Sequence, residues 1–317
     1  MLMTHSVASL LLGTMIVLGA GEVFGQAYPN KPIRFVTAEV GGGGDFAARL
    51  IAPGISGPLG QPVIVENRNT YIGPVIVSKS PPDGYTLLWA GNILWLLPHM
   101  QDNVPSDKDF SPITTAQVSP NILVVNPSLP VKSVKELIAL AKAKPGALNY
   151  SSSAAGTASH LSAELFKSMA GVNIVRIAYK GNGPAVLALV SGEVQFGFPS
   201  PGSSGPHIKS GKLRALAVTS ARRSALYPDL PTVADGLPGY ELTNITGLFV
   251  PAKTPAPIIR RLNHEIVRVL NSADVKEKIL STGVEPVTSS PEEFAAAIKL
   301  DSARLGKVIK DARIRAE

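Results

Sequence analysis

The sequence predicts an α/β protein built from two lobes, and three observations support this expectation. Short β-rich apolar runs alternate with segments of helical periodicity, a pattern typical of parallel strands covered by helices. The chain has 317 residues, more than a single compact core usually holds, so we expect two lobes. Hydrophobic residues make up 45% and charged residues 17% of the chain, which is typical of a folded protein.

The first 27 residues differ in composition from the rest of the chain. Val7–Ala20 is almost entirely apolar or small, and Glu22 is the one formally charged side chain of this block. The apolar run is shorter than a membrane span and is followed by small residues that suit a signal peptidase. We therefore expect a signal peptide over residues 1–27, cut after Gly25 or Ala27, although its first residues include no Lys or Arg.

Several classes of site are excluded or disfavoured by composition. The chain has no cysteine, which excludes disulfides, thiolate metal sites and a cysteine nucleophile. The five histidines lie far apart, without the spacing of metal ligands, and we expect no metal, no cofactor and no catalytic residues. Basic residues outnumber acidic ones by 30 to 23, but they are scattered, so we do not expect nucleic acid as a partner.

The most informative stretch joins a predicted strand, Ile33–Ala38, to a predicted helix, Asp45–Ser56. Four consecutive glycines, Gly41–Gly44, lie between them. Glycines at such a turn let the backbone fold tightly and bring its N–H groups close to a ligand. The helix N-terminus adds unpaired donors and a partial positive charge, so we expect an anion there. Pro53 lies inside the predicted helix and should bend or shorten it.

A second stretch has the same design about a hundred residues later. The predicted strand Leu148–Ser151 leads into a loop of small polar residues, Ser152–Ser159. A helix follows, with Leu161, Leu165 and Met169 on one face. Because ligands of α/β proteins sit at the carboxyl ends of the strands, two such loops in separate lobes could hold one compact anion across a shared cleft.

The remaining elements follow in order along the chain. The predicted strands are Pro62–Glu66, Tyr85–Ala90, Asn121–Asn126, Ile174–Ala178, Val194–Phe198, Leu213–Thr219 and Gly247–Val250. The predicted helices are Tyr71–Lys79, Ser133–Lys144, Ala185–Ser191, a helix from Thr254 to Leu270, Ser272–Thr282 and a last one from Ser290. We interpret Gly202–Gly205 as a small-residue turn, Ala221–Tyr240 as an ordered loop or short helices, and everything after Val250 as helical.

A series of motifs, in order, covers essentially the whole chain after residue 27. They are Tyr28–Arg34, Gly41–Asp45 with Arg49, Leu59–Val63, Val65–Arg68, Pro82–Leu87, Gly156-Thr157 with His160, Tyr179–Gly181, Leu213–Thr219, Leu230–Val233 and Gly283–Pro286. This series resembles the Bug family, the extracytoplasmic solute-binding proteins of tripartite tricarboxylate transporters.

The resemblance implies a two-lobed periplasmic-binding fold in which each lobe is a mostly parallel sheet flanked by helices. Residues 28–126 and 248–317 would form lobe 1, and residues 127–247 would form lobe 2. It also implies a periplasmic protein, not an enzyme, that closes around a small carboxylate, including aromatic or amphoteric carboxylates. The membrane subunits of a tripartite transporter would be its partners, and we expect a monomer.

Carried over position by position, the resemblance places the ligand at the strand-end loops. The expected ligand-binding residues are Ala38, Glu39, Gly41, Gly42, Gly43, Gly44, Asp45, Gly91, Asn92, Ser152, Ser153, Ala154, Gly156, Thr157, His160, Tyr179, Pro199 and Ser200. Three of them have simpler alternatives. Asp45 could be a helix cap, His160 could pack or cap, and Tyr179 could be a core residue with a satisfied hydroxyl.

An enzyme remains as the alternative. Gly42, Gly44 and Ala47 follow a predicted strand, and Glu66 ends the next strand about 20 residues later, as in the dinucleotide-binding fingerprint. This pattern would suit an NAD-dependent oxidoreductase. The expected export signal, Pro53 in the helix after the turn and the lack of an evident hydride-transfer constellation argue against it.

The chain departs from the family pattern at three places. Ala38 stands where an aromatic residue is usual, Asn69–Gly73 replaces a loop commonly rich in Pro and Gly, and Phe198–Ser200 replaces a strand end that is often acidic. Losing an aromatic residue enlarges the pocket, and Glu39 disfavours a purely anionic guest. We therefore hypothesise a ligand that is bulkier than a simple dicarboxylate, or one that carries a cationic or hydrogen-bond-donating group.

Replacing Glu39 by Gln should tighten the binding of plain dicarboxylates about threefold, because it removes a like charge near the anion. Isothermal titration with succinate would measure this change. An unchanged affinity would contradict a role for Glu39 in ligand choice.

Overall fold

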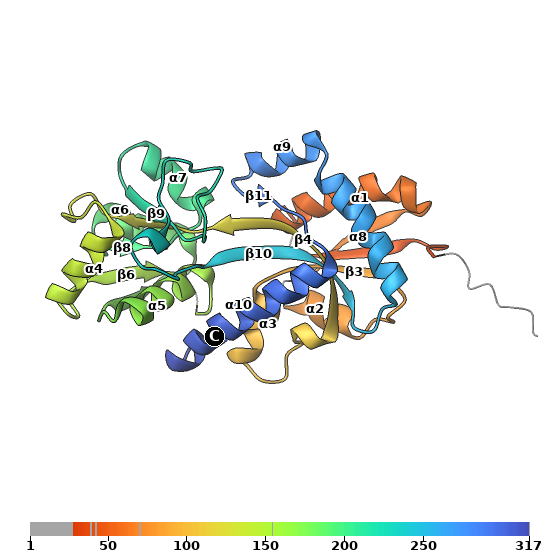
Figure 1. Cartoon of the computed structure of the whole chain (residues 1–317), viewed down its shortest axis with the longest axis horizontal. Coiled ribbons are helices and arrows are strands. Elements are labelled where there is room, and N and C mark those ends of the chain that lie inside the picture. Colours follow the sequence, from red (N-terminus) through yellow and green to blue (C-terminus); the bar gives the residue numbers. More distant parts are fainter. Residues whose placement is uncertain (1–27, 39, 42, 70, 154, 317) are drawn as a thin grey trace, which may run out of the picture.

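The computed structural model describes residues 28–316 except 39, 42, 70 and 154, and two α/β lobes lie side by side in it (Figure 1). The first lobe is at the right of Figure 1 and the second at the left, with two long strands passing between them. The predicted signal peptide, with its cleavage sites after Gly25 or Ala27, lies outside the described residues. No helix in the described part of the chain is long and apolar enough to cross a membrane.

In the described part of the chain, the sheet of the first lobe has six strands in the order β11-β4-β10-β3-β1-β2. Strands β1, β2 and β3 pair in parallel, whereas β10 runs antiparallel to β3 and β4, and β11 antiparallel to β4. The bounds are β1 (Ile33–Thr37), β2 (Val63–Asn67), β3 (Thr86–Gly91), β4 (Phe110–Pro120), β10 (Thr243–Pro251) and β11 (Glu285–Pro286).

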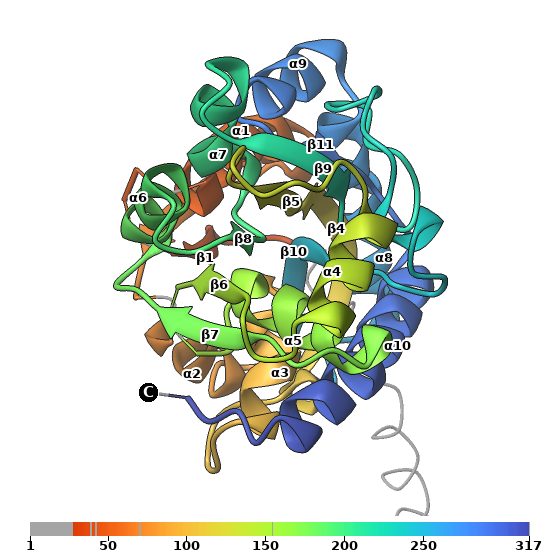
Figure 2. The same cartoon turned by 90° about the vertical axis from the view of Figure 1, so that its left-hand side faces the viewer.

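The sheet of the second lobe, which faces the viewer in Figure 2, has five described strands in the order β7-β6-β8-β5-β9. Strand β6 is parallel to β7 and β8, and β5 is antiparallel to β8 and β9. The bounds are β5 (Ile122–Val125), β6 (Asn149–Ser152), β7 (Val175–Ala178), β8 (Phe196–Gly197) and β9 (Arg214–Val218).

Helices cover both faces of each sheet. In the first lobe, α1 (Gly43–Leu59), α8 (Ala256–Leu270) and α9 (Ala273–Ser281) share one core, and α2 (Ile72–Ser78), α3 (Ile93–Leu96) and α10 (Pro291–Asp311) contribute to another. In the second lobe, α4 (Val134–Ala143) and α5 (Ala158–Ala170) join that second core, and α6 (Asn182–Ser191) and α7 (Pro201–Lys209) pack on the opposite face. Short 3-10 turns, η1 (Leu97–His99), η2 (Asp107–Asp109) and η3 (Val233–Asp235), complete the set.

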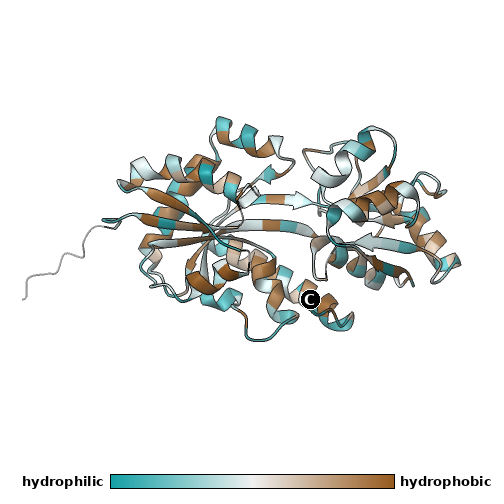
Figure 3. Cartoon of the chain, turned by 180° about the vertical axis from the view of Figure 1, so that it is seen from behind, coloured by the Kyte–Doolittle hydropathy of each residue, from teal (hydrophilic) through white to brown (hydrophobic). Residues whose placement is uncertain are grey.

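Strand β1 shows why the sequences of the parallel strands are continuously apolar. Ile33 and Phe35 are fully buried in one core, and Val36 is fully buried in the other, so β1 is covered on both faces. Several strands of this sheet carry long brown stretches in Figure 3, whereas the two long strands between the lobes are largely pale and the surface helices alternate brown and teal. One of the cores continues from lobe to lobe, since Trp95 of α3 belongs to the same cluster as Phe166 of α5.

Strands β4 and β10 run antiparallel through the middle of the molecule and carry the chain between the lobes (Figure 1). Asparagine side chains connect their ends to the rest of the structure. The Asn244 side-chain amide donates to Oδ1 of Asn121 at 3.1 Å, and the Asn121 amide donates to the carbonyl of Phe198 at 2.7 Å. These side-chain hydrogen bonds connect the ends of both crossing strands, β4 and β10, to the second sheet.

Asp301 of α10 stabilises the crossing region, where β4 and β10 pass between the lobes. Its carboxylate is 3% exposed and accepts hydrogen bonds from Asn92 Nδ2 at 2.7 Å, from Trp95 Nε1 at 2.8 Å and from Arg304 at 3.2 Å. Asn92 in turn accepts from the backbone N–H of Ile245 in β10 at 2.6 Å. One buried carboxylate thus links α10, α3 and a crossing strand.

The expected α/β class, with two sheets flanked by helices, is confirmed, and the sheets are mixed. Strand β4 has no counterpart among the sequence predictions because Pro112, Pro120 and its polar residues hide the β pattern. It is stabilised instead by pairing with β10 along its length. The chain changes sheets between β4 and β5, and the lobe limits at residues 126 and 247 stay a prediction.

Three local predictions were wrong. Helix α1 continues through Pro53 to Leu59, because its apolar face packs on α8, where a Cβ on Gly54 would lie 2.7 Å from Val269. Gly202–Gly205 is not a turn but part of α7, which begins with Pro201 at a position that suits proline. The C-terminal region is not entirely helical, since β11 pairs with β4. Packing explains the first difference, a favourable helix start the second and strand pairing the third.

Replacing Asp301 by Ala should destabilise the protein by about 3 kcal/mol, because Arg304 and two buried N–H donors lose their shared acceptor. Urea unfolding followed by circular dichroism would measure this loss. Asp311→Ala provides the control, since Asp311 forms an exposed pair with Lys307 and its loss should cost less than about 1 kcal/mol. Equal effects of the two substitutions would contradict the role of Asp301.

Candidate functional site

The glycine loop of the first lobe is held in shape by Asp45. Its carboxylate, 5% exposed, accepts from the N–H of Gly41 at 2.9 Å, from Arg49 Nε at 2.8 Å and from Asn67 Nδ2 at 2.9 Å. The backbone hydrogen bond from Gly41, followed by that from Asn67, lowers the pKa of Asp45. Asp45 therefore closes the loop upon itself, which supports the structural alternative for this residue.

Position 44 requires glycine because neighbouring side chains leave no room for a Cβ. A Cβ at this position would lie 2.8 Å from the Thr37 hydroxyl and 2.9 Å from the Trp89 ring. The N-terminus of α1 therefore lies directly against the ends of β1 and β3. Asn67 of β2 adds a bond from Nδ2 to the carbonyl of Ala38 at 2.7 Å, so the loop is anchored to the strand ends around it.

The loop of the second lobe is organised by three hydroxyls. Ser153 Oγ lies 2.9 Å from the Thr157 hydroxyl and 3.0 Å from that of Ser159, and Thr157 and Ser159 are 3.2 Å apart. The N–H of Gly156 donates to Nδ1 of His160 at 3.1 Å. Burial lowers the pKa of His160 to about 4, so its ring is neutral at neutral pH and can accept this bond.

Arg176 of β7 lies against this loop and was not recognised from the sequence. Its Nε donates to Ser152 Oγ at 2.8 Å and its terminal nitrogen donates to the carbonyl of Ser153 at 2.9 Å. No ion pair joins Arg176 to a carboxylate within the described residues. The half-buried guanidinium thus adds positive potential beside a loop of hydroxyls and N–H groups. An isolated basic residue in an apolar strand was the available signal.

The two lobes touch at the second loop. Gly156 has φ +74°, and a Cβ there would lie 2.3 Å from the sulfur of Met100. Met100 follows η1 of the first lobe, and its side chain is 3% exposed. The loop of one lobe thus packs directly on the other, and glycine permits both the conformation and the contact.

Two of the expected ligand residues, Gly91 and Asn92, lie beside the strands that pass between the lobes. Asn92 donates to Asp301 and to the carbonyl of Thr243 at 3.2 Å and accepts from Ile245, so its side-chain amide is fully engaged. A Cβ on Gly91 would lie 3.3 Å from the Ile245 carbonyl oxygen. The sequence could not distinguish this role, because both residues also follow a strand end.

The other expected ligand residues differ in their surroundings. The half-buried Tyr179 donates to Glu193 at 2.8 Å, and burial raises its pKa to about 12, so its hydroxyl is satisfied although the residue is not in the core. Ser152 is buried beneath its loop, the Pro199 carbonyl accepts from Ile122, and the Ser200 hydroxyl lies 3.0 Å from that of Ser203. Gly43 begins α1, whereas Glu39, Gly42 and Ala154 lie outside the described residues.

The structure gives the dinucleotide fingerprint no support. Glu66, which would bind a ribose, accepts from Arg34 at 2.9 and 2.7 Å and also pairs with Arg68. These hydrogen bonds, led by that from Arg34, lower the pKa of Glu66. The described residues also contain no group of three or more His, Asp or Glu that could hold a metal ion.

Comparisons with known proteins identify relatives along nearly the whole chain. The family described as "Tripartite tricarboxylate transporter family receptor" matches residues 47–314. Protein BugT of Bordetella pertussis (strain Tohama I) is 35% identical over 303 residues, which cover 92% of this chain and 92% of BugT. These matches extend over both lobes.

Two solved structures are informative. A protein of R. palustris solved with adipate is 35% identical and has a TM-score of 0.71, over 91% of this chain and 99% of that one. A TctC solute-binding protein from Polaromonas, solved with no ligand, is 25% identical and has a TM-score of 0.83, over 90% and 99%. The shape of this chain therefore agrees better with the unliganded structure, although that sequence is less similar.

Replacing Asp45 by Asn should destabilise the protein by about 1 kcal/mol at pH 7, because its charge-assisted hydrogen bonds weaken. The folded-state pKa of Asp45 is depressed, so the stabilisation is present above the unfolded value near 4 and is lost as pH falls through the folded value. Urea unfolding between pH 7 and pH 3 should therefore show the difference from the unsubstituted protein shrinking. A difference that is constant with pH would contradict this.

Proposed function

Because this chain belongs to the tripartite tricarboxylate transporter receptor family, we propose that it captures a small carboxylate in the cleft between its lobes for delivery to membrane subunits. It is a receptor and not an enzyme, as its relatives are solute-binding proteins. The proposal extends to an exported monomer that has lost residues 1–27, with residues 28–126 and 248–317 in one lobe and residues 127–247 in the other.

The observation that carries this proposal is the loop Ser152–Ser159 with Arg176 beside it. Three hydroxyls and the N-terminus of a 13-residue helix converge there, and a guanidinium without a carboxylate partner in the described structure lies against the loop. Hydroxyls, helix N–H groups and a cation all favour a negatively charged ligand. Because the loop is held by its own hydrogen bonds, little ordering is needed when an anion binds.

The glycine loop of the first lobe would complete the site on closure. The N-terminus of α1 lies against Thr37 and Trp89 of the first sheet, and the loop before it is held by the hydrogen bond from Gly41 to Asp45. The higher TM-score with a relative solved with no ligand than with one solved with adipate supports the view that the lobes are here in their ligand-free arrangement. A ligand that touches both loops only when the lobes approach would stabilise the closed state through these additional contacts.

Thermal-shift measurements on protein that has been unfolded and refolded to remove any carried ligand would test this function. The panel contains succinate, adipate, benzoate, phenylacetate, glutamate, nicotinate and NAD. A carboxylate at a hundred times its Kd should add about 2.7 kcal/mol to the free energy of unfolding. A response to NAD alone, or to no carboxylate, would overturn the proposal.

Replacing Arg176 by Met should weaken the binding of each responding carboxylate about tenfold, because the loop loses two hydrogen bonds and the nearby positive charge. Titration calorimetry would measure the affinities. Arg260→Met, at an exposed position of α8, lowers the net charge equally and should leave them unchanged. Equal losses in both variants would indicate a general effect of charge and no specific role for Arg176.

A further inference from the structure

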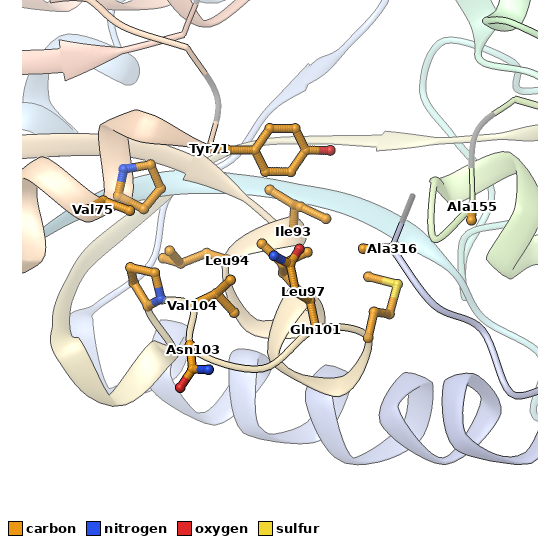
Figure 4. Close-up of a pocket in the computed structure, with 13 residues that line it drawn as sticks. Tyr71, Val75, Ile93, Leu94, Leu97, Gln101, Asn103, Val104, Ala155 and Ala316 are labelled. Carbon is orange, nitrogen blue, oxygen red and sulfur yellow. The ribbon is translucent and has the colours of Figure 1, made fainter.

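A cavity of about 320 Å³ opens on the first lobe beside the point where the two lobes touch (Figure 4). It lies among α2, α3, the segment after η1 and the end of the chain at Ala316. This volume is at the lower end of the range for small-molecule sites, so it suits a body about the size of one ring.

The cavity is continuous with the proposed anion loop. Ala155, which lies inside the loop Ser152–Ser159, is part of the cavity wall. The next residue, Gly156, packs against Met100, and Met100 lines the cavity from the first lobe. A ligand whose charged end lies at the loop could therefore extend its other end into this space.

The part of the cavity wall that the structure describes is uncharged. Thirteen described residues line it, none of these is an Asp, Glu, Lys, Arg or His, and three have a polar side-chain group, namely Tyr71, Gln101 and Asn103. A second carboxylate placed here would lose its hydration without gaining a cation, which is costly. An apolar body would gain from burial against Val75, Leu97 and their neighbours.

Tyr71 is placed to cover such a body. Its side chain is 60% exposed, unusual for an aromatic residue, and in Figure 4 its hydroxyl points toward the side of Ala155. The Tyr71 N–H donates to Oδ1 of Asn69 at 2.9 Å, and the Asn69 carbonyl accepts from Ile72 and Gly73 at 2.9 Å. The backbone around Tyr71 is thus held by hydrogen bonds, and it presents the aromatic ring at the cavity.

We propose that this cavity binds the apolar body of the ligand, and that the ligand is a monocarboxylate with an aromatic or branched aliphatic body. The inference rests on the proposed function, since the loop beside Arg176 must hold the carboxylate. The cavity then determines which carboxylates are accepted. Linear dicarboxylates are disfavoured because their distal charge would meet the uncharged wall.

Titration calorimetry of the refolded protein with phenylacetate, 4-methylpentanoate, succinate and adipate tests this inference. The two monocarboxylates should bind at least about tenfold more tightly than the two dicarboxylates, with a negative heat-capacity change from apolar burial. Val75→Phe fills the cavity and should weaken phenylacetate about tenfold. Val75→Thr, which alters polarity with little change in shape, should weaken it about threefold.

Val175→Phe in β7 is the matched control, since Val175 is 42% exposed against 37% for Val75 and does not line the cavity. It should leave the affinity for phenylacetate unchanged. Tight binding of dicarboxylates with no effect of either Val75 substitution would overturn the inference and leave the proposed function intact. Binding of phenylacetate that is insensitive to both Val75 substitutions would also overturn it. No binding of any carboxylate would overturn both proposals.

Discussion

The arrangement of this molecule depends on the antiparallel pairing of β4 with β10, the two strands that carry the chain between the sheets. Their backbone groups are satisfied by each other, so the connection between the lobes is a defined two-stranded ribbon. Amide side chains at its ends, from Asn121 and Asn244, extend this bonding into the second sheet. This ribbon therefore sets how the two sheets follow one another along the chain.

Helix α10 provides a second connection between the lobes. Helix α10 packs against α5 of the second lobe as well as against β4 of the first. Asp301 then joins that helix to Asn92 and Trp95. These bonds lie within the first lobe, and a buried carboxylate shared by several donors is costly to break, so α10 is firmly fixed there while it contacts the second lobe.

The polar and apolar parts of the proposed site are built by different means. At the loops, side chains such as Asp45 and His160 use their hydrogen bonds to fix the backbone, and the helix N-termini are thereby presented in a stable form. In the cavity, shape and lack of charge replace hydrogen bonds. In the proposed site, the loops would hold the carboxylate and the cavity would choose the body attached to it.

Much of this architecture follows from the sequence alone. Three of its features are local patterns, each formed by residues that are neighbours in the chain. They are the alternation of strands and helices, the glycine run ending at Asp45 and the small polar loop from Ser152. The family resemblance adds the two-lobed receptor, which the comparisons confirm. These features are predictable because periodicity, capping and turn chemistry act over a few residues.

The remaining features were decided by tertiary structure. Strand β4 is stabilised by its partner β10, and α1 continues through Pro53 because its face is packed. Asn92 donates to Asp301 of α10, which lies beside it although it is more than two hundred residues away in the chain. Arg176 and Met100 reach the second loop from separate elements, and the cavity wall is drawn from distant segments. Contacts between residues far apart in the chain depend on the packing of whole elements, which no local pattern encodes.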